Sequence, residues 1–292
     1  MSVDALQEKI RKTKCPVMLE LSASASDLPG HILSEAGSEA AAYGRVCREL
    51  LAALKDSLPA VRVSFSSFSL LGAEGMTQLS GILEYAGKLG YYVALDAPEI
   101  LGVRAAERTA QTIFADGSAF PCDGLILGCY LGSDCIKPFL PGCKTSRKDV
   151  FVAIRTANRT APELQDLLAG GRLVHTAAAD LVSRCGADLS GKYGYSPVAA
   201  LSAANAPDSL RTLRAKYPRM FLLVDGYSSV GANAKNCSYG FDKFGHGAVV
   251  CGGGAIVRAW QQAQSDGTDY LQQAQSEVDR MKRNLLRYIT IL

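Results

Sequence analysis

The chain has 292 residues, of which 48% are hydrophobic and 20% are charged, a composition typical of a globular protein. Lys and Arg exceed Asp and Glu by 31 − 28 = 3 charges, and these charges are dispersed, which argues against a nucleic-acid surface or a membrane surface. No apolar run reaches membrane-spanning length, and the nine cysteines form no CxxC pair and no zinc-ligand spacing. We therefore expect a cytoplasmic protein without a metal or cofactor.

Eight short runs are predicted to be strands, and the one at Tyr91–Leu95, which has no polar alternation, is typical of a parallel strand that is buried on both faces. These runs are Val17–Leu21, Ala60–Phe65, Tyr91–Asp96, Asp123–Gly128, Val150–Ile154, Val198–Ser202, Phe221–Val224 and Gly247–Val250. Helical patterns are predicted at Ser2–Lys14, Glu39–Leu54, Glu74–Leu89, Val103–Phe114, Ala161–Leu168, Leu173–Asp188, Asp208–Lys216, Ala255–Gln264 and Asp269–Tyr288. Ser133 is expected to cap a further short helix after the fourth strand.

The alternation of eight strands with helices predicts an α/β fold, the (β/α)8 TIM barrel, over a length of about 250 residues. Ser2–Lys14 is an additional amino-terminal helix, and Asp269–Tyr288 is an amphipathic closing helix. No stretch rich in Pro, Gly or Ser divides the chain. Residues 1–292 are therefore expected to form a single domain.

Catalytic groups of such barrels lie at the carboxyl ends of the strands. Those positions hold Ser22, Ser64, Asp96, Gly128, Arg155, Ser202, Asp225 and Cys251. The set suggests no carboxylate pair for acid–base work, and no lysine stands beside Asp96. The three histidines are in no recognised nucleophile motif, so structural or exposed roles are expected for them.

Two glycine-rich loops follow the last two strands, at Asp225–Ala234 and Cys251–Gly254. Barrels commonly bind phosphate there, because glycines let backbone N–H groups approach an anion. Neither loop contains Lys or Arg, so tight turns explain the glycines equally well. Both interpretations remain open.

Eight segments together resemble the orotidine 5′-phosphate decarboxylase family, in its longer bacterial type, almost from end to end. They are CPVMLELSAS, LPAVRVSF, YVALDAPEILG, CYLGSDCIKPFL, DVFVAIRTANRTAPELQDL, LSGKYGYSPVAALSAANAP, FLLVDGYSSVGANA and GAVVCGGGAIV. The resemblance implies a decarboxylase that removes CO2 from a pyrimidine nucleotide, with a lysine that stabilises and protonates the resulting carbanion.

The family motif Asp-x-Lys-x-x-Asp is degraded in this sequence. Asp96 matches the first aspartate, but Pro98 stands at the lysine and Leu101 at the second aspartate. Arg62 stands where the family has a lysine at the end of strand two, and Ser22 replaces the ribose-binding aspartate of a GLDP-like segment. Asp96 and Arg62 are thus vestigial catalytic candidates, and Asp96 is expected to pair with Arg62 or to face solvent.

The phosphate contacts of the family are also altered. Val230 aligns with the glutamine of a PGYGAQGG-like loop, and Gly254 aligns with the arginine of an NSSR-like segment. A positioned general acid contributes roughly 10²–10⁴ in rate and one electrostatic donor about 10²–10³, so these changes together predict negligible decarboxylation. The candidate ligand-binding residues are Ser22, Arg155, Ser202, Tyr227, Gly252, Gly253 and Gly254.

Three hypotheses follow. The favoured one is a non-catalytic relative that keeps a barrel pocket for a phosphorylated small molecule or nucleotide, or for a partner protein. A second is a divergent enzyme that uses Asp96 and Arg155 in the same cavity, and a third is an active decarboxylase with rearranged residues. The resemblance also implies a homodimer, because family members build each active site across a dimer interface.

Overall fold

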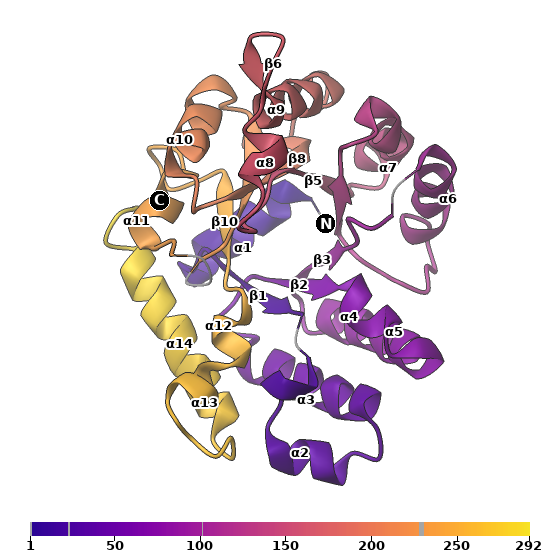
Figure 1. The fold of residues 1–292 in the computed structure, drawn as a ribbon, viewed down its shortest axis with the longest axis vertical. Coiled ribbons are helices and arrows are strands. Elements are labelled where there is room, and N and C mark those ends of the chain that lie inside the picture. The colour runs from indigo at the N-terminus through magenta and orange to yellow at the C-terminus, as the bar shows by residue number, and fades with distance from the viewer. Residues whose placement is uncertain (1, 23, 101, 228–230) are drawn as a thin grey trace.

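A computed structural model describes residues 2–22, 24–100, 102–227 and 231–292. Its centre is a closed barrel of parallel strands in the order β1-β10-β9-β8-β5-β4-β3-β2, surrounded by helices (Figure 1). The barrel strands are β1 (Val17–Leu21), β2 (Ala60–Ser64), β3 (Tyr92–Asp96), β4 (Gly124–Gly128), β5 (Asp149–Arg155), β8 (Ser196–Ala203), β9 (Met220–Asp225) and β10 (Ala248–Cys251). This architecture confirms the predicted (β/α)8 barrel.

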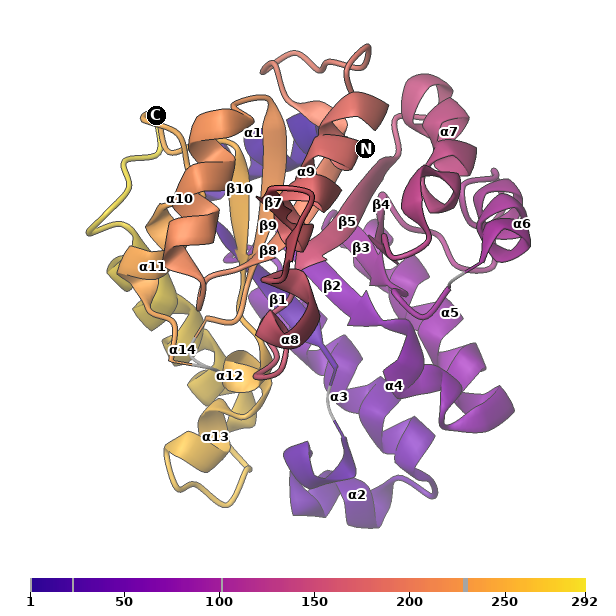
Figure 2. The same ribbon diagram turned by 45° about the horizontal axis from the view of Figure 1, so that its top comes forward.

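The helices cover the outside of the barrel, as the turned view shows (Figure 2). They are α1 (Val3–Thr13), α2 (Gly30–Glu35), α3 (Glu39–Leu54), α4 (Phe65–Ser69), α5 (Gly72–Lys88), α6 (Val103–Ile113), α7 (Leu140–Thr145), α8 (Pro162–Gln165), α9 (Val174–Cys185), α10 (Pro207–Lys216), α11 (Ala234–Ser238), α12 (Gly254–Val257), α13 (Ala259–Gln262) and α14 (Tyr270–Leu285). Apolar residues at helical spacing give each long helix one buried face, as in α14, where Ala274, Val278 and Met281 are fully buried.

The amino-terminal helix α1 forms as the sequence predicts and packs against the barrel. In α1, Leu6 and Ile10 are fully buried, and Gln7 accepts a hydrogen bond from the backbone N–H of Gly247 at 2.9 Å. Because Gly247 precedes β10, this contact ties α1 to the amino-terminal end of the barrel. The carboxyl ends of the strands are thereby left as the open end, where a site can form.

Three local predictions were wrong. The expected helix Ala161–Leu168 stops at Gln165 and is followed by a hairpin of β6 (Leu168–Ala169) and β7 (Arg172–Leu173), because Gly170 and Gly171 adopt φ values of 59° and 78°. The expected helix Ala255–Gln264 is divided into α12 and α13. Ser133 lies inside a 3₁₀ turn, Gly132–Cys135, and that turn has no side-chain cap.

Within the ranges that the structure describes, no helix combines the length and the apolar character needed to cross a membrane.

A buried acid at the start of β5 gives a stability prediction. The Tyr92 hydroxyl donates to Asp149 Oδ2 at 2.6 Å, both residues are fully buried, and burial raises the pKa of Asp149 well above its usual value. A raised carboxyl pKa means that the folded protein loses stability as pH rises above the unfolded pKa, about 3.9. Asp149→Asn removes the ionisable carboxyl group. The amide oxygen of the asparagine can still accept the hydrogen bond from the Tyr92 hydroxyl.

We therefore expect Asp149→Asn to increase the free energy of unfolding by about 1–3 kcal/mol at pH 8 and by less at pH 5. Urea unfolding at the two pH values measures this difference. Asp208→Asn, at a side chain that is 91% exposed, is the control and should change little. A gain that is the same at both pH values would contradict the assignment of a raised pKa.

Candidate site at the barrel mouth

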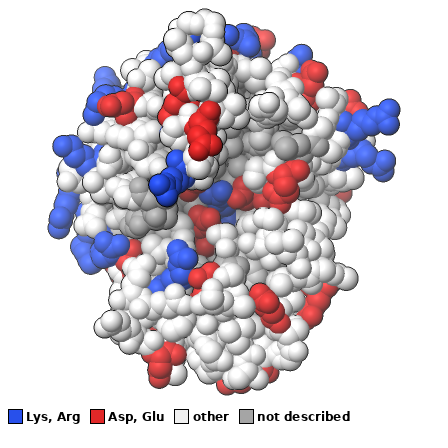
Figure 3. Space-filling model, in the orientation of Figure 1, with Lys and Arg blue, Asp and Glu red and all other residues white. Residues whose placement is uncertain are grey.

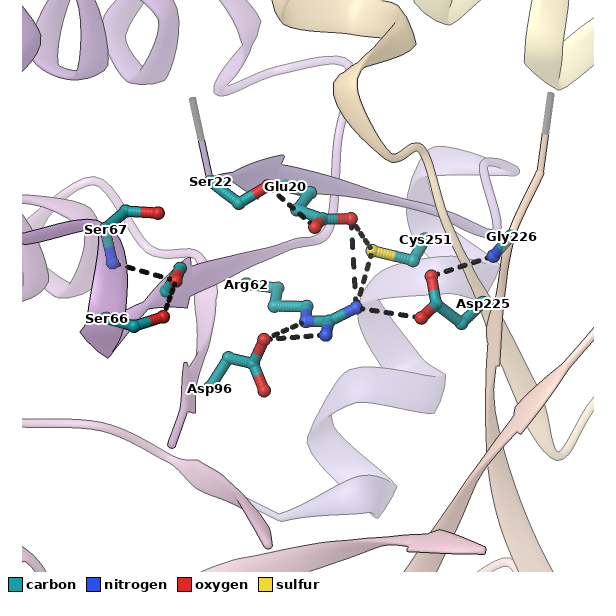
Figure 4. Close-up of polar contacts among 10 residues, drawn as sticks. Glu20, Ser22, Arg62, Ser66, Ser67, Asp96, Asp225, Gly226 and Cys251 are labelled. Carbon is teal, nitrogen blue, oxygen red and sulfur yellow. Dashed lines mark hydrogen bonds and ion pairs between the residues drawn. The ribbon is translucent and has the colours of Figure 1, made fainter. Parts of the chain in front are cut away.

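Four side chains converge on the guanidinium of Arg62 at the carboxyl ends of the strands (Figure 4). Asp96 Oδ2 accepts from Arg62 Nε at 2.9 Å and from Nη2 at 2.6 Å. Arg62 Nη1 lies 3.4 Å from Asp225 Oδ2, 3.8 Å from Glu20 Oε2 and 3.7 Å from Cys251 Sγ. These five residues, which we call the Arg62 centre, come from five barrel strands, namely β1, β2, β3, β9 and β10.

The strand register explains why these side chains meet. Glu20 pairs with Arg62 across β1 and β2, and Arg62 pairs with Ala94, two residues before Asp96 on β3. Residues paired in this way share a face of the sheet, and alternate residues along a strand return to that face. Glu20, Arg62 and Asp96 therefore all point into the barrel. The carboxylates thus project inward at the carboxyl end of the barrel, where the catalytic groups of such barrels lie.

The pKa shifts describe a centre that is held together by one cation. Burial would lower the pKa of Arg62, but Glu20, Asp225 and Asp96 together raise it well above its usual value. For Asp96, burial outweighs the attraction of Arg62 and raises the pKa. For Glu20, burial is outweighed by Arg62 and by hydrogen bonds from Cys251 and Ser22, so its pKa is lowered.

A metal ion could in principle use part of this cluster, since Glu20, Asp225 and Cys251 offer ligand atoms within 4.8 Å of one another. The guanidinium already occupies that position, because Arg62 Nη1 lies 3.4–3.8 Å from an atom of each of the three. A divalent cation there would meet a fixed positive charge at short range. The cluster therefore carries its own counter-ion, and we assign no metal to it.

A small space beside the centre is lined by Glu20, Ser22, Asp27, Gly254 and Arg258, and its volume is 70 Å³. This volume is far below the 300–1,000 Å³, roughly, of pockets that hold a nucleotide-sized ligand. Figure 3 shows red and blue side chains meeting in the hollow near the middle of this face. This space is therefore too small for a nucleotide, and most of its described lining residues are charged or polar.

Comparison with known proteins identifies the family. An orotidine 5′-phosphate decarboxylase from Rhodopirellula baltica is 33% identical over 231 residues, covering 76% of this chain and 75% of that protein. The chain belongs to the orotidine 5′-phosphate decarboxylase family. A decarboxylase from Clostridium perfringens is 26% identical over 286 residues, covering 98% of both chains. No family model matches the sequence.

Solved structures of lower identity support the same fold. The OMP decarboxylase of Leishmania donovani superposes with a TM-score of 0.73 at 23% identity, covering 97% of this chain and 99% of that one. The orotidine 5′-monophosphate decarboxylase of Plasmodium berghei gives a TM-score of 0.76 at 14% identity, covering 98% and 99%. At these identities the likeness shows the barrel alone.

The structure brings together the two catalytic residues that the sequence predicted, Asp96 and Arg62. Asp96 pairs with Arg62, which confirms one of the two arrangements expected for that carboxylate. Ser22 donates to Glu20 Oε1 at 2.8 Å, so it lies at the edge of the Arg62 centre. Leu101 and Val230 lie outside the described residues, and Pro98 is an exposed residue just past β3.

Arg155 and Ser202, two predicted ligand-binding residues, face away from the Arg62 centre. Arg155 donates to both carboxylate oxygens of Asp166 at 2.9 and 3.0 Å, after a register shift between Ala153 and Arg155. Ser202 precedes Ala203, which pairs with the inward Asp225, so Ser202 faces the surrounding helices. Its hydroxyl is fully buried and has no hydrogen-bond partner among the described residues.

The glycine loop after β10 lies at the mouth, as predicted. Gly253 has a φ of 54° and a ψ of −162°, a conformation that side-chain-bearing residues rarely adopt. A Cβ at Gly254 would overlap the guanidinium of Arg258, and one at Gly252 would overlap Ile256. Tyr227 is buried and forms an isolated bridge with Ala232. The guanidinium of Arg258, which follows Gly254 by one helical turn, therefore occupies the space that the side chain of an arginine at position 254 would enter.

Sequence reasoning missed Glu20 and Arg258, and it did not bring Asp225 and Cys251 to Arg62. The GLDP-like and PGYGAQGG-like segments of the family resemblance have a glycine and a proline at the positions of Glu20 and Asp225, so the resemblance did not mark either carboxylate as part of the site. The detectable signal was a single charge inside a buried strand, Glu20 in VMLEL and Arg62 in AVRVS. The expectation that the strand ends lack a carboxylate pair was wrong, because closure of the barrel brings distant strands together.

Proposed function

We propose that this member of the orotidine 5′-phosphate decarboxylase family does not catalyse decarboxylation and serves a binding role. The observation that carries the proposal is the Arg62 centre. Pro98 stands where the resemblance places the family's proton-donating lysine, and the described barrel strands contain no lysine. The nearest cation is a guanidinium, which stays protonated near neutral pH and is already shared by three carboxylates.

The charge of the mouth supports the same conclusion. Orotidine 5′-phosphate carries a carboxylate and a phosphate, whereas Glu20, Asp96 and Asp225 place three carboxylates around one arginine. Like charges brought together out of bulk water repel one another strongly. We propose that a phosphorylated ligand retained in the barrel pocket binds at the edge of the mouth, where Arg258 lies over Gly254 and pairs with Asp27 at 3.6 Å.

The divergent-enzyme hypothesis receives less support. It requires Asp96 and Arg155 to act in one cavity, but Asp96 binds Arg62 and Arg155 binds Asp166.

All nine cysteines are free thiols, which agrees with the proposal of a reducing, cytoplasmic location.

Turnover of orotidine 5′-phosphate tests the proposed function. We expect no formation of uridine 5′-monophosphate above the uncatalysed rate, because the described barrel strands contain no lysine and the Arg62 guanidinium does not give up a proton near neutral pH. The Rhodopirellula baltica relative, assayed at the same enzyme concentration, is the positive control. Saturable product formation that Asp96→Ala abolishes would reject the proposal.

We also propose a homodimer formed through the carboxyl-end rim of β2, β3 and β4. Four apolar side chains are exposed after these neighbouring strands: Leu70 (85%), Val103 (43%), Tyr130 (78%) and Leu131 (46%). Large apolar side chains that stay exposed on a folded chain favour association. Sedimentation at micromolar concentration should show a dimer, and Leu70→Glu with Leu131→Glu should shift it to monomer. Leu168→Glu, on the hairpin outside this rim, should leave the dimer intact.

A further inference from the structure

A groove on the outside of the barrel runs between α11 and the end of α14. It has a volume of 350 Å³, and its charged lining residues are Lys235 on α11 and Arg280 and Arg287 on or just after α14. Among the described residues, none that lines the groove is acidic. Figure 3 shows several blue side chains along the edge that α10, α11 and α14 occupy in Figure 1.

The cations of this groove are incompletely neutralised. Arg280 uses Nε and Nη2 to bind both oxygens of Glu277, each at 2.6 Å. Lys235 and Arg287 form no ion pair with any residue in the described part of the chain. Two unpaired positive charges therefore line one groove from elements about 50 residues apart, an arrangement that costs energy unless solvent ions or a bound anion offset it.

The usual explanation for cations near a helix end covers only part of this arrangement. Positive side chains in the last turn of a helix interact favourably with its dipole, which accounts for Lys282 and Arg283 on α14. Lys235 belongs to a different helix, and Arg287 follows the end of α14. Arg287 lies next to the carboxyl terminus of α14 and also gains from that dipole, but Lys235 on α11 does not, so the dipole does not explain why both line one groove.

We propose that this groove binds a phosphate monoester of up to mononucleotide size. Its volume falls at the lower end of small-molecule pockets, which span roughly 300–1,000 Å³. Lys235 and Arg287 would hold the phosphate, while the half-exposed Tyr288 ring and the Asn284 amide line the rest of the groove. The groove is distinct from the Arg62 centre, because no residue of that centre lines it, although Tyr227, one of the predicted ligand-binding residues, does.

Isothermal titration with adenosine 5′-monophosphate and with inorganic phosphate tests the proposal. We expect saturable binding of the nucleotide in the wild type, and a loss of at least about tenfold in affinity when Lys235→Ala and Arg287→Ala are combined. Arg283→Ala is the matched control: it removes a positive charge from the same helix end but does not line the groove. Circular dichroism confirms that each variant is folded.

Three outcomes would overturn the proposal. One is the absence of saturable binding at millimolar ligand. Another is an equal loss in the Arg283→Ala variant, which would indicate a general effect of net charge. The third is binding that survives the double substitution and disappears in Arg258→Ala, which would move the ligand to the barrel mouth. None of these outcomes depends on whether the protein decarboxylates orotidine 5′-phosphate.

Discussion

Replacing Arg62 with leucine is expected to lower the free energy of unfolding by about 3–5 kcal/mol, the usual cost of removing one partner from a buried ion pair. The substitution leaves Glu20, Asp96 and Asp225 facing one another without the cation that they share. Urea unfolding measures the loss. The matched control is Arg211→Leu, whose pair with Asp208 is exposed and should contribute less than about 1 kcal/mol.

The loss should depend on pH. Arg62 lowers the pKa of Glu20 in the wild type, so that contribution to stability is present above the unfolded pKa and is lost as pH falls. Without Arg62, burial alone acts on Glu20 and Asp96 and favours their neutral forms. The difference between wild type and Arg62→Leu should therefore grow from pH 5 to pH 8.

A compensated variant distinguishes charge from packing. Arg62→Leu combined with Glu20→Gln and Asp96→Asn removes two of the three uncompensated charges and should recover most of the lost stability, because a buried ionic cluster can be replaced by neutral groups at little cost. If Arg62→Leu were as stable as the Arg211→Leu control, the Arg62 centre would not hold the barrel together.

The barrel could be predicted from the sequence because each strand is a local pattern. Val17–Leu21 and Glu39–Leu54 match the observed β1 and α3 without error, since continuous apolar runs and helical spacing leave few alternatives. The pattern fails where a few residues decide the outcome. Gly170 and Gly171 turn an expected helix into a hairpin through their positive φ values, and periodicity carries no information about that.

The site was only partly predictable, for a different reason. Asp96 and Arg62 were found because they align with the family motif, and their pairing followed from the cost of a lone buried carboxylate. Glu20 and Cys251 match none of the functional residues of the family motifs. Their thiol–carboxylate hydrogen bond of 3.1 Å joins residues 231 positions apart, and only the closure between β1 and β10 brings them together.

Restoring decarboxylation should require several substitutions at once. Pro98→Lys alone is expected to give no product, because the second carboxylate of the motif and the phosphate contacts are still missing and residues that act as a unit are strongly non-additive. Pro98→Lys, Leu101→Asp, Val230→Gln and Gly254→Arg together should recover at most a trace. Formation of uridine 5′-monophosphate, followed by chromatography, measures each step.

The Arg62 centre identifies what that fourfold variant still lacks. Glu20 holds Arg62 and Cys251 in place, and it adds a carboxylate next to the space that a substrate anion must enter. Adding Glu20→Gly and Arg62→Lys should therefore raise the rate of the fourfold variant by at least about 10², the effect of one positioned charge. A Glu20→Gln, Arg62→Lys version on the same background separates removal of charge from removal of volume. Full activity from Pro98→Lys alone would show instead that the added carboxylates do not block the reaction.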